Sequence, residues 1–163
     1  MNIRKATLKD LDKITEIEAI CFPKSEAASK ESFKERLEVY SDCFWLLEED
    51  GQIVSFINGM KTDEITINDE MFANAKLHNP KGKWLAIFGV NTLPEYHNRG
   101  LAGKLMETVI LETKKQGCKG CILTCKDKLV HYYEKFGYKN KGISKSVHGG
   151  AVWYDMILEF KDE

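Results

Sequence analysis

The sequence predicts an α/β fold in a single domain over residues 1–163, with about seven strands and about four helices. Apolar runs typical of strands alternate along the chain with segments whose apolar residues recur at helical spacing. The pair Asp50-Gly51 separates two of these apolar runs, which indicates a β-hairpin. The chain contains no linker, repeat or low-complexity tract, and its length suffices for one sizeable core.

The first elements are a strand and two helices. Residues 2–6 are expected to form the strand. Apolar residues at helical spacing predict a helix over residues 11–21, which Pro23 then ends. Ser29, which charged residues follow, indicates the start of a second helix that runs to Val39.

A hairpin and a long insertion come next. The hairpin strands are predicted over residues 44–48 and 53–60, on either side of the Asp50-Gly51 turn. Residues 61–82 form a polar insertion in which residues 69–75 are expected to form a short helix. Insertions of this length in compact domains are often functional lids. The sequence leaves open whether this insertion covers a site.

The second half begins with a central strand over residues 84–90. An apolar stripe predicts a long helix over residues 101–113, which Gly117 closes. A strand over residues 118–125 and a short helix over residues 129–136 follow. A final hairpin is predicted around His148-Gly149-Gly150, with strands at residues 142–147 and 152–160.

Composition excludes several classes of function. The formal net charge is −1, so no global field attracts nucleic acid or an anionic membrane. No apolar run approaches transmembrane length and no signal-peptide pattern is visible, so a cytoplasmic protein is expected. The five cysteines are odd in number and lie in apolar runs, which indicates reduced thiols. Cys118-x-x-Cys121 lacks a second ligand pair, so no metal site is predicted.

The turn from Pro94 to Gly103 connects the central strand to the long helix and has the features of an anion site. The first turn of a helix offers unpaired N–H donors and the positive end of the helix dipole. Gly100 and Gly103 allow close approach, and Arg99 adds a positive charge. A phosphate or pyrophosphate is the expected guest. The Walker A pattern and the three-glycine dinucleotide fingerprint are both absent.

Two motifs carry a resemblance to a known family. His97-Asn98-Arg99-Gly100-Leu101-Ala102 resembles the acyl-CoA loop of the GNAT acetyltransferase superfamily, [Gln/Arg]-x-x-Gly-x-[Gly/Ala], and departs from it at His97. Tyr133-Glu134-Lys135-Phe136-Gly137-Tyr138 resembles the superfamily's second motif, at the right distance and after one intervening strand. The run over residues 123–138 looks most like the arylalkylamine N-acetyltransferase branch. The resemblance is specific over residues 84–138.

This resemblance implies the GNAT fold, in which a mixed, mostly antiparallel sheet opens into a V beside the central strand. Acetyl-CoA would lie in that opening as a co-substrate. The pantetheine arm would pair with the backbone of Val90 and Thr92, and the Val90 N–H would face the thioester oxygen. The loop would hold the pyrophosphate through Asn98, Arg99, Gly100, Leu101, Ala102 and Gly103.

The resemblance also assigns the acid but not the base. It places the Tyr133 hydroxyl at the CoA sulfur, where a protonated phenol can donate to the leaving thiolate. The arylalkylamine branch carries two histidines on the central strand, but Ala86 and Phe88 occupy those positions here. Their mechanism therefore does not carry over. The remaining candidates for the base are Glu64, Glu70, His148, a water chain or a desolvating pocket.

The sequence therefore predicts an acetyl-CoA-dependent N-acetyltransferase that acts on a small amine by direct attack in a ternary complex. The aromatic residues Phe22, Trp84, Phe88 and Trp153 favour an aromatic or hydrophobic amine over a polycation. A protein or peptide acceptor and a non-catalytic acyl-CoA-binding module are the alternatives. A monomer or homodimer is expected.

Overall fold

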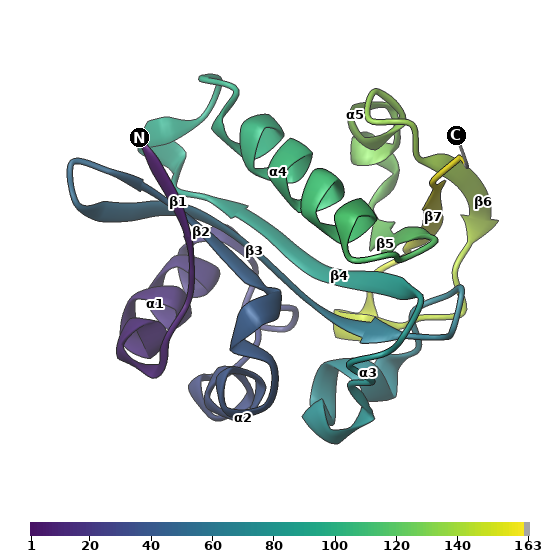
Figure 1. Cartoon of the computed structure of the whole chain (residues 1–163), viewed down its shortest axis with the longest axis horizontal. Helices are drawn as coiled ribbons and strands as arrows, with labels where there is room; N and C mark the ends of the chain where they lie inside the picture. Colours follow the sequence, from purple (N-terminus) through teal and green to yellow (C-terminus); the bar gives the residue numbers. More distant parts are fainter. Residues whose placement is uncertain (162–163) are drawn as a thin grey trace.

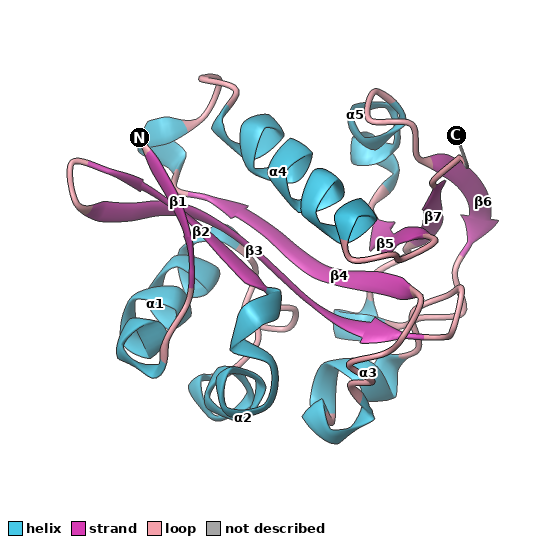
Figure 2. Cartoon of the chain, viewed as in Figure 1, coloured by secondary structure: helices cyan, strands magenta, loops and turns pink. Residues whose placement is uncertain are grey.

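The computed structural model describes residues 1–161, and its strands form one seven-stranded sheet in the order β1-β2-β3-β4-β5-β7-β6 (Figures 1 and 2). Every neighbouring pair is antiparallel except β4 and β5, which are parallel. The mixed, mostly antiparallel sheet that the resemblance implied is therefore confirmed. The strands are β1 (Asn2–Lys5), β2 (Phe44–Glu49), β3 (Gln52–Thr62), β4 (Trp84–Thr92), β5 (Gly120–Cys125), β6 (Lys139–Ile143) and β7 (Tyr154–Glu159).

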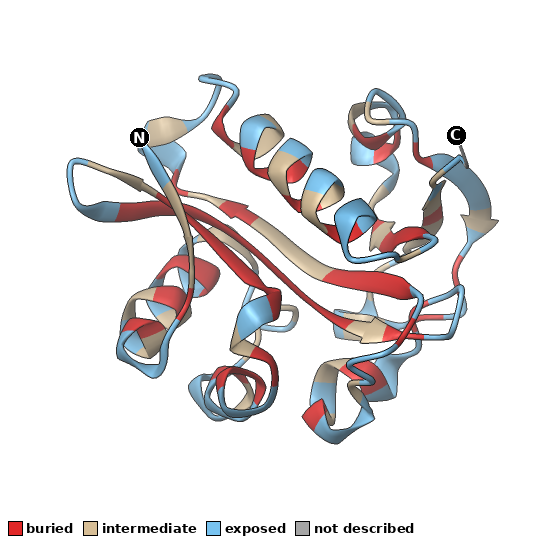
Figure 3. Ribbon diagram, in the orientation of Figure 1, coloured by how far each residue is buried: buried red, intermediate tan, exposed pale blue. Residues whose placement is uncertain are grey.

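Helices cover both faces of this sheet. Figure 1 shows α1, α2 and α3 below the sheet and α4 and α5 above it. The buried residues concentrate on the central strands and on the helix surfaces that face them (Figure 3). The five α-helices of the described chain are α1 (Leu11–Cys21), α2 (Lys30–Tyr40), α3 (Asp69–Ala73), α4 (Leu101–Lys115) and α5 (Val130–Glu134).

Local signals set the helix ends where the sequence predicted them. Ser29 caps α2, because its side chain accepts a hydrogen bond from the Ser32 N–H. Gly117 has φ +83° just after α4, in the left-handed region that glycine adopts without a steric penalty. Helix α4 places Leu105 and Val109 in the core, as its apolar stripe predicted.

A β-bulge opens the sheet at its centre. In the pairing of β3 with β4, Asn58 lies opposite Gly89 and Gly59 lies opposite Ile87, so Phe88 has no partner. A bulge bends its strand and increases the local twist. The parallel pairing of β4 with β5 also ends at Ile87, opposite Leu123. Beyond this point the two strands diverge, which confirms the predicted V-shaped opening.

The final hairpin differs from its prediction. Strand β6 covers residues 139–143 rather than 142–147, and β7 covers 154–159 rather than 152–160. Gly142 has φ +96° at a bulge that interrupts the pairing of β6 with β7 between Asn140 and Ile143. Residues 144–153 then form a loop with a 3₁₀ turn at His148–Gly150. Besides its internal hydrogen bonds, this loop bonds to Asp69 and Glu26 in distant parts of the chain, which a pattern of alternating residues does not reveal.

The insertion between β3 and β4 contains the short helix that the sequence predicted. Asn68 caps α3 through its side chain, and Met71 and Ala75 anchor the segment in the core. Asp69 accepts hydrogen bonds from the Ser146 hydroxyl and the Val147 N–H. The insertion is therefore joined to the loop between β6 and β7.

All five cysteines are unpaired, as expected for reduced thiols. In the part of the chain that the structure describes, no helix combines the length and the apolar character that crossing a membrane requires.

Candidate functional site

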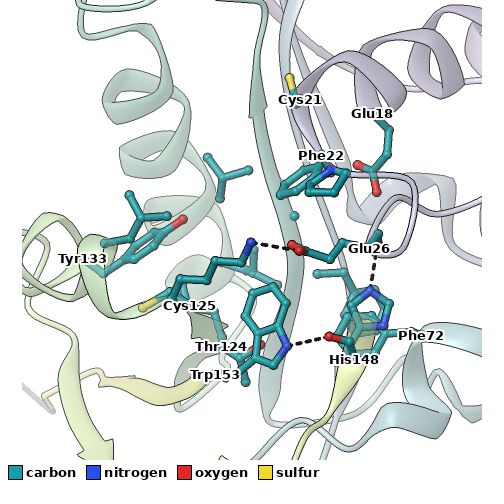
Figure 4. A pocket seen from close by; sticks show the side chains of 18 of the residues that line it. Glu18, Cys21, Phe22, Glu26, Phe72, Thr124, Cys125, Tyr133, His148 and Trp153 are labelled. Carbon is teal, nitrogen blue, oxygen red and sulfur yellow. Dashed lines mark hydrogen bonds and ion pairs between the residues drawn. The ribbon is translucent and has the colours of Figure 1, made fainter. Parts of the chain in front are cut away.

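A cavity of about 300 Å³ lies where β4 and β5 diverge (Figure 4). Its walls come from α1 and the connector to α2, from β4, from the end of β5, from α5 and from the β6–β7 loop. The lining residues are Glu18, Cys21, Phe22, Pro23, Glu26, Phe72, Ile87, Phe88, Gly89, Val90, Leu123, Thr124, Cys125, Lys126, Lys128, Leu129, Tyr133, His148 and Trp153.

One edge of β4 is free to bind an extended ligand. The Leu93 N–H donates to the Val54 carbonyl, and the Asn91 carbonyl accepts from the Ser55 hydroxyl, so these residues direct their backbone groups toward β3. Backbone groups alternate in direction along a strand. Val90 and Thr92 therefore direct theirs toward the opening, and Val90 lines the cavity. This is the edge that the resemblance assigned to the pantetheine arm.

The backbone of Thr92, which the resemblance assigned to the pantetheine arm, already has hydrogen-bond partners within the protein. Its carbonyl accepts hydrogen bonds from the His97 ring (Nε2 to O, 2.9 Å) and from the Cys21 thiol (Sγ to O, 3.3 Å). Thr92 does not line the cavity, and its carbonyl already has two partners. His97 therefore has a structural role, because it ties the turn back to the end of β4. The part of Thr92 in cofactor binding stays a prediction.

The predicted phosphate loop has a backbone suited to an anion. Asn98 (φ +63°) and Gly100 (φ +72°) both adopt the left-handed region, and α4 begins at Leu101. The N–H groups of Leu101, Ala102 and Gly103 belong to the first turn, which has no partners within its helix. Arg99 lies over the Tyr96 ring at 5.0 Å and is exposed at this end of the helix. The part of these residues in phosphate binding stays a prediction.

Tyr133 lies on α5 at the side of the cavity formed by β5 and α5. Its side chain is 7% exposed, and its hydroxyl points toward the cavity (Figure 4). Burial raises the pKa of Tyr133, and Tyr132 and Cys125 raise it further. The hydroxyl therefore stays protonated at neutral pH, as a proton donor requires. Its position agrees with the role that the sequence predicted.

Glu18 lies across the cavity from Tyr133, and the sequence analysis missed it (Figure 4). It is 6% exposed; Oε2 accepts a hydrogen bond from the Ala28 N–H at 2.9 Å, whereas Oε1 is buried without a partner. Burial raises the pKa of Glu18, although the Ala28 N–H and the nearby Arg36 oppose the rise. The signal was a carboxylate on the apolar stripe of α1, next to Ile14 and Ile17.

A series of polar contacts joins three segments around the cavity. Lys126, which follows β5, pairs with Glu26 of the α1–α2 connector (Nζ to Oε2, 2.8 Å). The His148 Nε2–H donates to the Glu26 carbonyl at 2.8 Å, and the Trp153 Nε1–H donates to the His148 carbonyl at 2.8 Å. Figure 4 shows these contacts as dashed lines. They hold the β6–β7 loop against the connector.

The aromatic wall is partly the predicted one. Phe22, Phe88 and Trp153 line the cavity, but Trp84 does not, because it packs in the core beside Gly120. Phe72 takes its place; it comes from the insertion and stacks on His148 with ring centroids 4.5 Å apart. An insertion residue could not be assigned to the site from sequence spacing.

Two of the three residues suggested as the base lie elsewhere. Glu64 and Glu70 are exposed and do not line the cavity, so their suggested placement at the site was wrong. Both lie on the outer side of the insertion, and Phe72 is the insertion residue that reaches the cavity instead. His148 does line it, as expected.

The cysteines in the cavity wall are not activated. Burial raises the pKa of Cys21, and it raises the pKa of Cys125 to about 11. Both thiols are therefore protonated at neutral pH and are weak nucleophiles. Among residues 1–161, no group of three or more His, Cys, Asp or Glu side chains could hold a metal ion.

Solved structures of similar fold include a GNAT-like decarboxylase, GphF, in complex with isobutyryl-CoA (TM-score 0.84, 21% identity, covering 99% of this chain and 100% of that one). A second is the ribosomal-protein-S18-alanine N-acetyltransferase from Escherichia coli (TM-score 0.75, 18% identity, 99% and 95% covered). A third is yncA, a putative acetyltransferase from Salmonella typhimurium with its cofactor acetyl-CoA (TM-score 0.71, 17% identity, 100% and 95% covered).

The family comparison settles what the fold and the motifs together indicated. The model of the acetyltransferase (GNAT) family matches residues 11–138, which include the predicted phosphate loop, the diverging strands β4 and β5, and the Tyr133 motif. The chain belongs to the GNAT family of acetyltransferases, whose acyl donor is acetyl-CoA.

Proposed function

We propose that this protein transfers the acetyl group of acetyl-CoA to the nitrogen of a small primary amine. The observation that carries the proposal is that the free edge of β4 at Val90 and Tyr133 line the same cavity. The turn that follows β4 leads to the N-terminus of α4, which would supply donors for a pyrophosphate. These are the parts that acetyl transfer from a CoA thioester requires.

The donor would lie along β4 in this account. Its pyrophosphate would bind the first-turn amides of α4, and its pantetheine arm would follow the free edge at Val90. The Val90 N–H would then donate to the thioester oxygen. A backbone donor aimed at that oxygen stabilises the negative charge that develops there in the transition state.

The transfer would proceed by direct attack. The amine nitrogen forms a bond to the thioester carbon, the C–S bond breaks, and Tyr133 donates its proton to the leaving thiolate. The nitrogen loses a proton, which restores the tyrosine. Because the Cys21 and Cys125 thiols are held protonated, the cavity does not favour an acyl-cysteine intermediate.

The acceptor side of the cavity favours an amine with an aromatic or apolar body. Phe22, Phe72, Phe88 and Trp153 supply apolar walls, and Glu18 supplies a carboxylate for the ammonium group. The likeness to the arylalkylamine branch supports the same class through the Tyr133 motif. A peptide N-terminus is the alternative acceptor, since one similar structure is a protein N-acetyltransferase.

A thiol-release assay with acetyl-CoA tests the proposal. The acceptors are 2-phenylethylamine, tryptamine, spermidine, free amino acids and short peptides with N-terminal alanine. We expect turnover with the arylalkylamines. Turnover confined to the peptides would contradict the small-amine acceptor, and CoA binding without thiol release would support a non-catalytic module.

Decarboxylation of an acyl-CoA is measured in parallel, because one similar structure is a decarboxylase. Malonyl-CoA without an amine should give no carbon dioxide. Its release at a rate above that of amine acetylation would replace the proposal.

A further inference from the structure

A second cavity of about 320 Å³ adjoins the first on the side of α2 and α3. The two cavities share the side chains of Glu18, Glu26, Phe72, Phe88 and His148. These five residues therefore form the junction between a space that reaches Tyr133 and a space that opens beside the α1–α2 connector. A donor lying along β4 would leave the second cavity as the route for an acceptor.

Glu18 is the polar residue at this junction that combines two features. One of its carboxylate oxygens has no hydrogen-bond partner, and its charge has no ion-pair partner among the described residues. Its Oε1 atom is buried without a hydrogen-bond partner. Glu26 also has one unpartnered oxygen, but its charge is paired with Lys126. The His148 Nε2–H is already bonded to the Glu26 carbonyl.

The position of Glu18 relative to β4 also suits a role in the reaction. A Cβ placed on Gly89 would lie 3.7 Å from Glu18 Oε1. Gly89 precedes Val90, whose N–H faces the opening. An ammonium group held by Oε1 would therefore lie beside the part of β4 along which the thioester would be bound.

We propose that the acceptor amine reaches the thioester through the second cavity and that Glu18 is the general base that deprotonates it. This inference rests on the proposed acetyl transfer. An alkylammonium ion with a pKa of about 10 is almost fully protonated at neutral pH and cannot attack. Its N–H proton passes to Glu18 Oε1, which leaves a neutral amine and a neutral carboxylic acid. The amine attacks the thioester, and Glu18 returns its proton to solvent after product leaves.

Several charged or polar groups face Glu18 and set its proton affinity. Burial raises its pKa, whereas Arg36 on α2, Asn91 on β4 and His148 in the β6–β7 loop lower it. Cys21 lies one helical turn away on α1, and burial and the negative charge of Glu18 both raise its pKa. The net direction is upward, which makes Glu18 a stronger base than a solvated glutamate.

Glu18→Gln tests the inference with two acceptors of nearly equal shape. Glutamine can still accept from the Ala28 N–H but cannot take a proton. With 2-phenylethylamine, kcat/KM should fall by about 10²–10⁴-fold, the usual effect of losing a general base. With 2,2-difluoro-2-phenylethylamine, whose less basic nitrogen is neutral in a far larger fraction of molecules at neutral pH, the loss should stay within about tenfold because less deprotonation is needed. In the wild-type protein, kcat/KM should rise with pH as Glu18 loses its proton and becomes able to act as a base. That rise should be absent in Glu18→Gln.

The matched control is Glu112→Gln. Glu112 lies on α4, away from both cavities, and is also a partly buried carboxylate. It pairs with Lys5 and accepts a hydrogen bond from the Trp45 indole on β2. This variant should leave both amines and the pH profile unchanged. Equal losses for the two amines in Glu18→Gln would assign Glu18 a positioning or structural role and overturn the inference.

A measurement that needs no turnover separates this inference from the proposed function. Infrared titration of the wild-type protein should show a carboxyl group that protonates above the ordinary glutamate value of about 4.3 and that is absent in Glu18→Gln. An ordinary midpoint for Glu18 would overturn the inference even if the amines are acetylated. Absence of thiol release in the wild-type protein would instead overturn the proposed acetyl transfer and the step that rests on it.

Discussion

The Glu26 carboxylate lies 2.8 Å from the Lys126 ammonium, although the two residues are 100 positions apart in the chain. This ion pair joins the α1–α2 connector to the residue that follows β5, across the cavity that both side chains line. Glu26 is almost buried, whereas Lys126 is about one-third exposed and also lies over the Trp153 ring. The pair therefore fixes two walls of the site relative to one another.

Removing only the Lys126 charge should destabilise the fold more than removing the charges of both Lys126 and Glu26. Lys126→Met leaves the buried Glu26 charge without its partner, and we expect it to lower the free energy of unfolding by about 1–3 kcal/mol, less than for a fully buried pair because Lys126 reaches solvent. Adding Glu26→Gln should recover part of that loss. Urea denaturation of the two single variants and the double variant checks this, and strictly additive effects would show that the pair does not couple the walls.

Gly100→Val should weaken acetyl-CoA binding sharply. A branched side chain at Gly100 would project where the pyrophosphate is expected to approach, and it would strain a residue whose φ is +72°. The control is Gly117→Val, which places the same side chain at φ +83° at the other end of α4, again with nothing within 4 Å of the new Cβ. Calorimetric titration with acetyl-CoA should show weaker binding for Gly100→Val alone. Equal affinities in the two folded variants would remove the loop from the cofactor site.

Tyr133→Phe should lower kcat by about 10²–10⁴-fold with little change in the KM for acetyl-CoA, because it deletes a proton donor and keeps the ring. Tyr132→Phe is the control, since Tyr132 is the neighbouring residue and does not line the cavity. Steady-state kinetics with 2-phenylethylamine and acetyl-CoA measures both. If chemistry limits the rate and the Tyr133 variant keeps more than about a third of wild-type kcat, another group supplies the proton.

Glu18→Gln should stabilise the fold at neutral and alkaline pH. The pKa of Glu18 is raised in the folded protein, chiefly by burial. Its contribution to stability is therefore fully present below the unfolded value of about 4.3 and is lost as the pH rises through the higher folded value. The melting temperature of the variant should exceed that of the wild-type protein at pH 8, and the difference should shrink toward pH 4. A lower melting temperature at pH 8 would mean that the ionised carboxylate is well compensated.

Local patterns predicted most of the fold. The Asp50-Gly51 turn, the Ser29 cap and the Gly117 termination are local signals. Each one acts on residues only a few positions away in the chain, so each can be recognised in the sequence. The bounds of β6 and β7 could not be predicted in this way. They depend on the bulge at Gly142 and on the bonds of Ser146 to Asp69 and of His148 to Glu26, which join distant segments.

The residues of the cavity were predictable in part, where a motif or the expected position of a segment indicated them. Tyr133 and Val90 were identified through the family motifs, and both line the cavity. Glu18 was missed because its place at the cavity follows from the packing of α1 against the bulged strand β4. Phe72 was missed for a similar reason, since the fold of the insertion decides which of its residues faces inward.

Product analysis tests the central claim most directly. The wild-type protein, acetyl-CoA and 2-phenylethylamine are incubated together, and N-acetyl-2-phenylethylamine and free CoA thiol are quantified by liquid chromatography and mass spectrometry. The account predicts that the two products form in equal amounts, and that the yield collapses in both Tyr133→Phe and Glu18→Gln. Thiol formed without the acetylated amine, or the acetylated amine formed at wild-type rates in both variants, would contradict it.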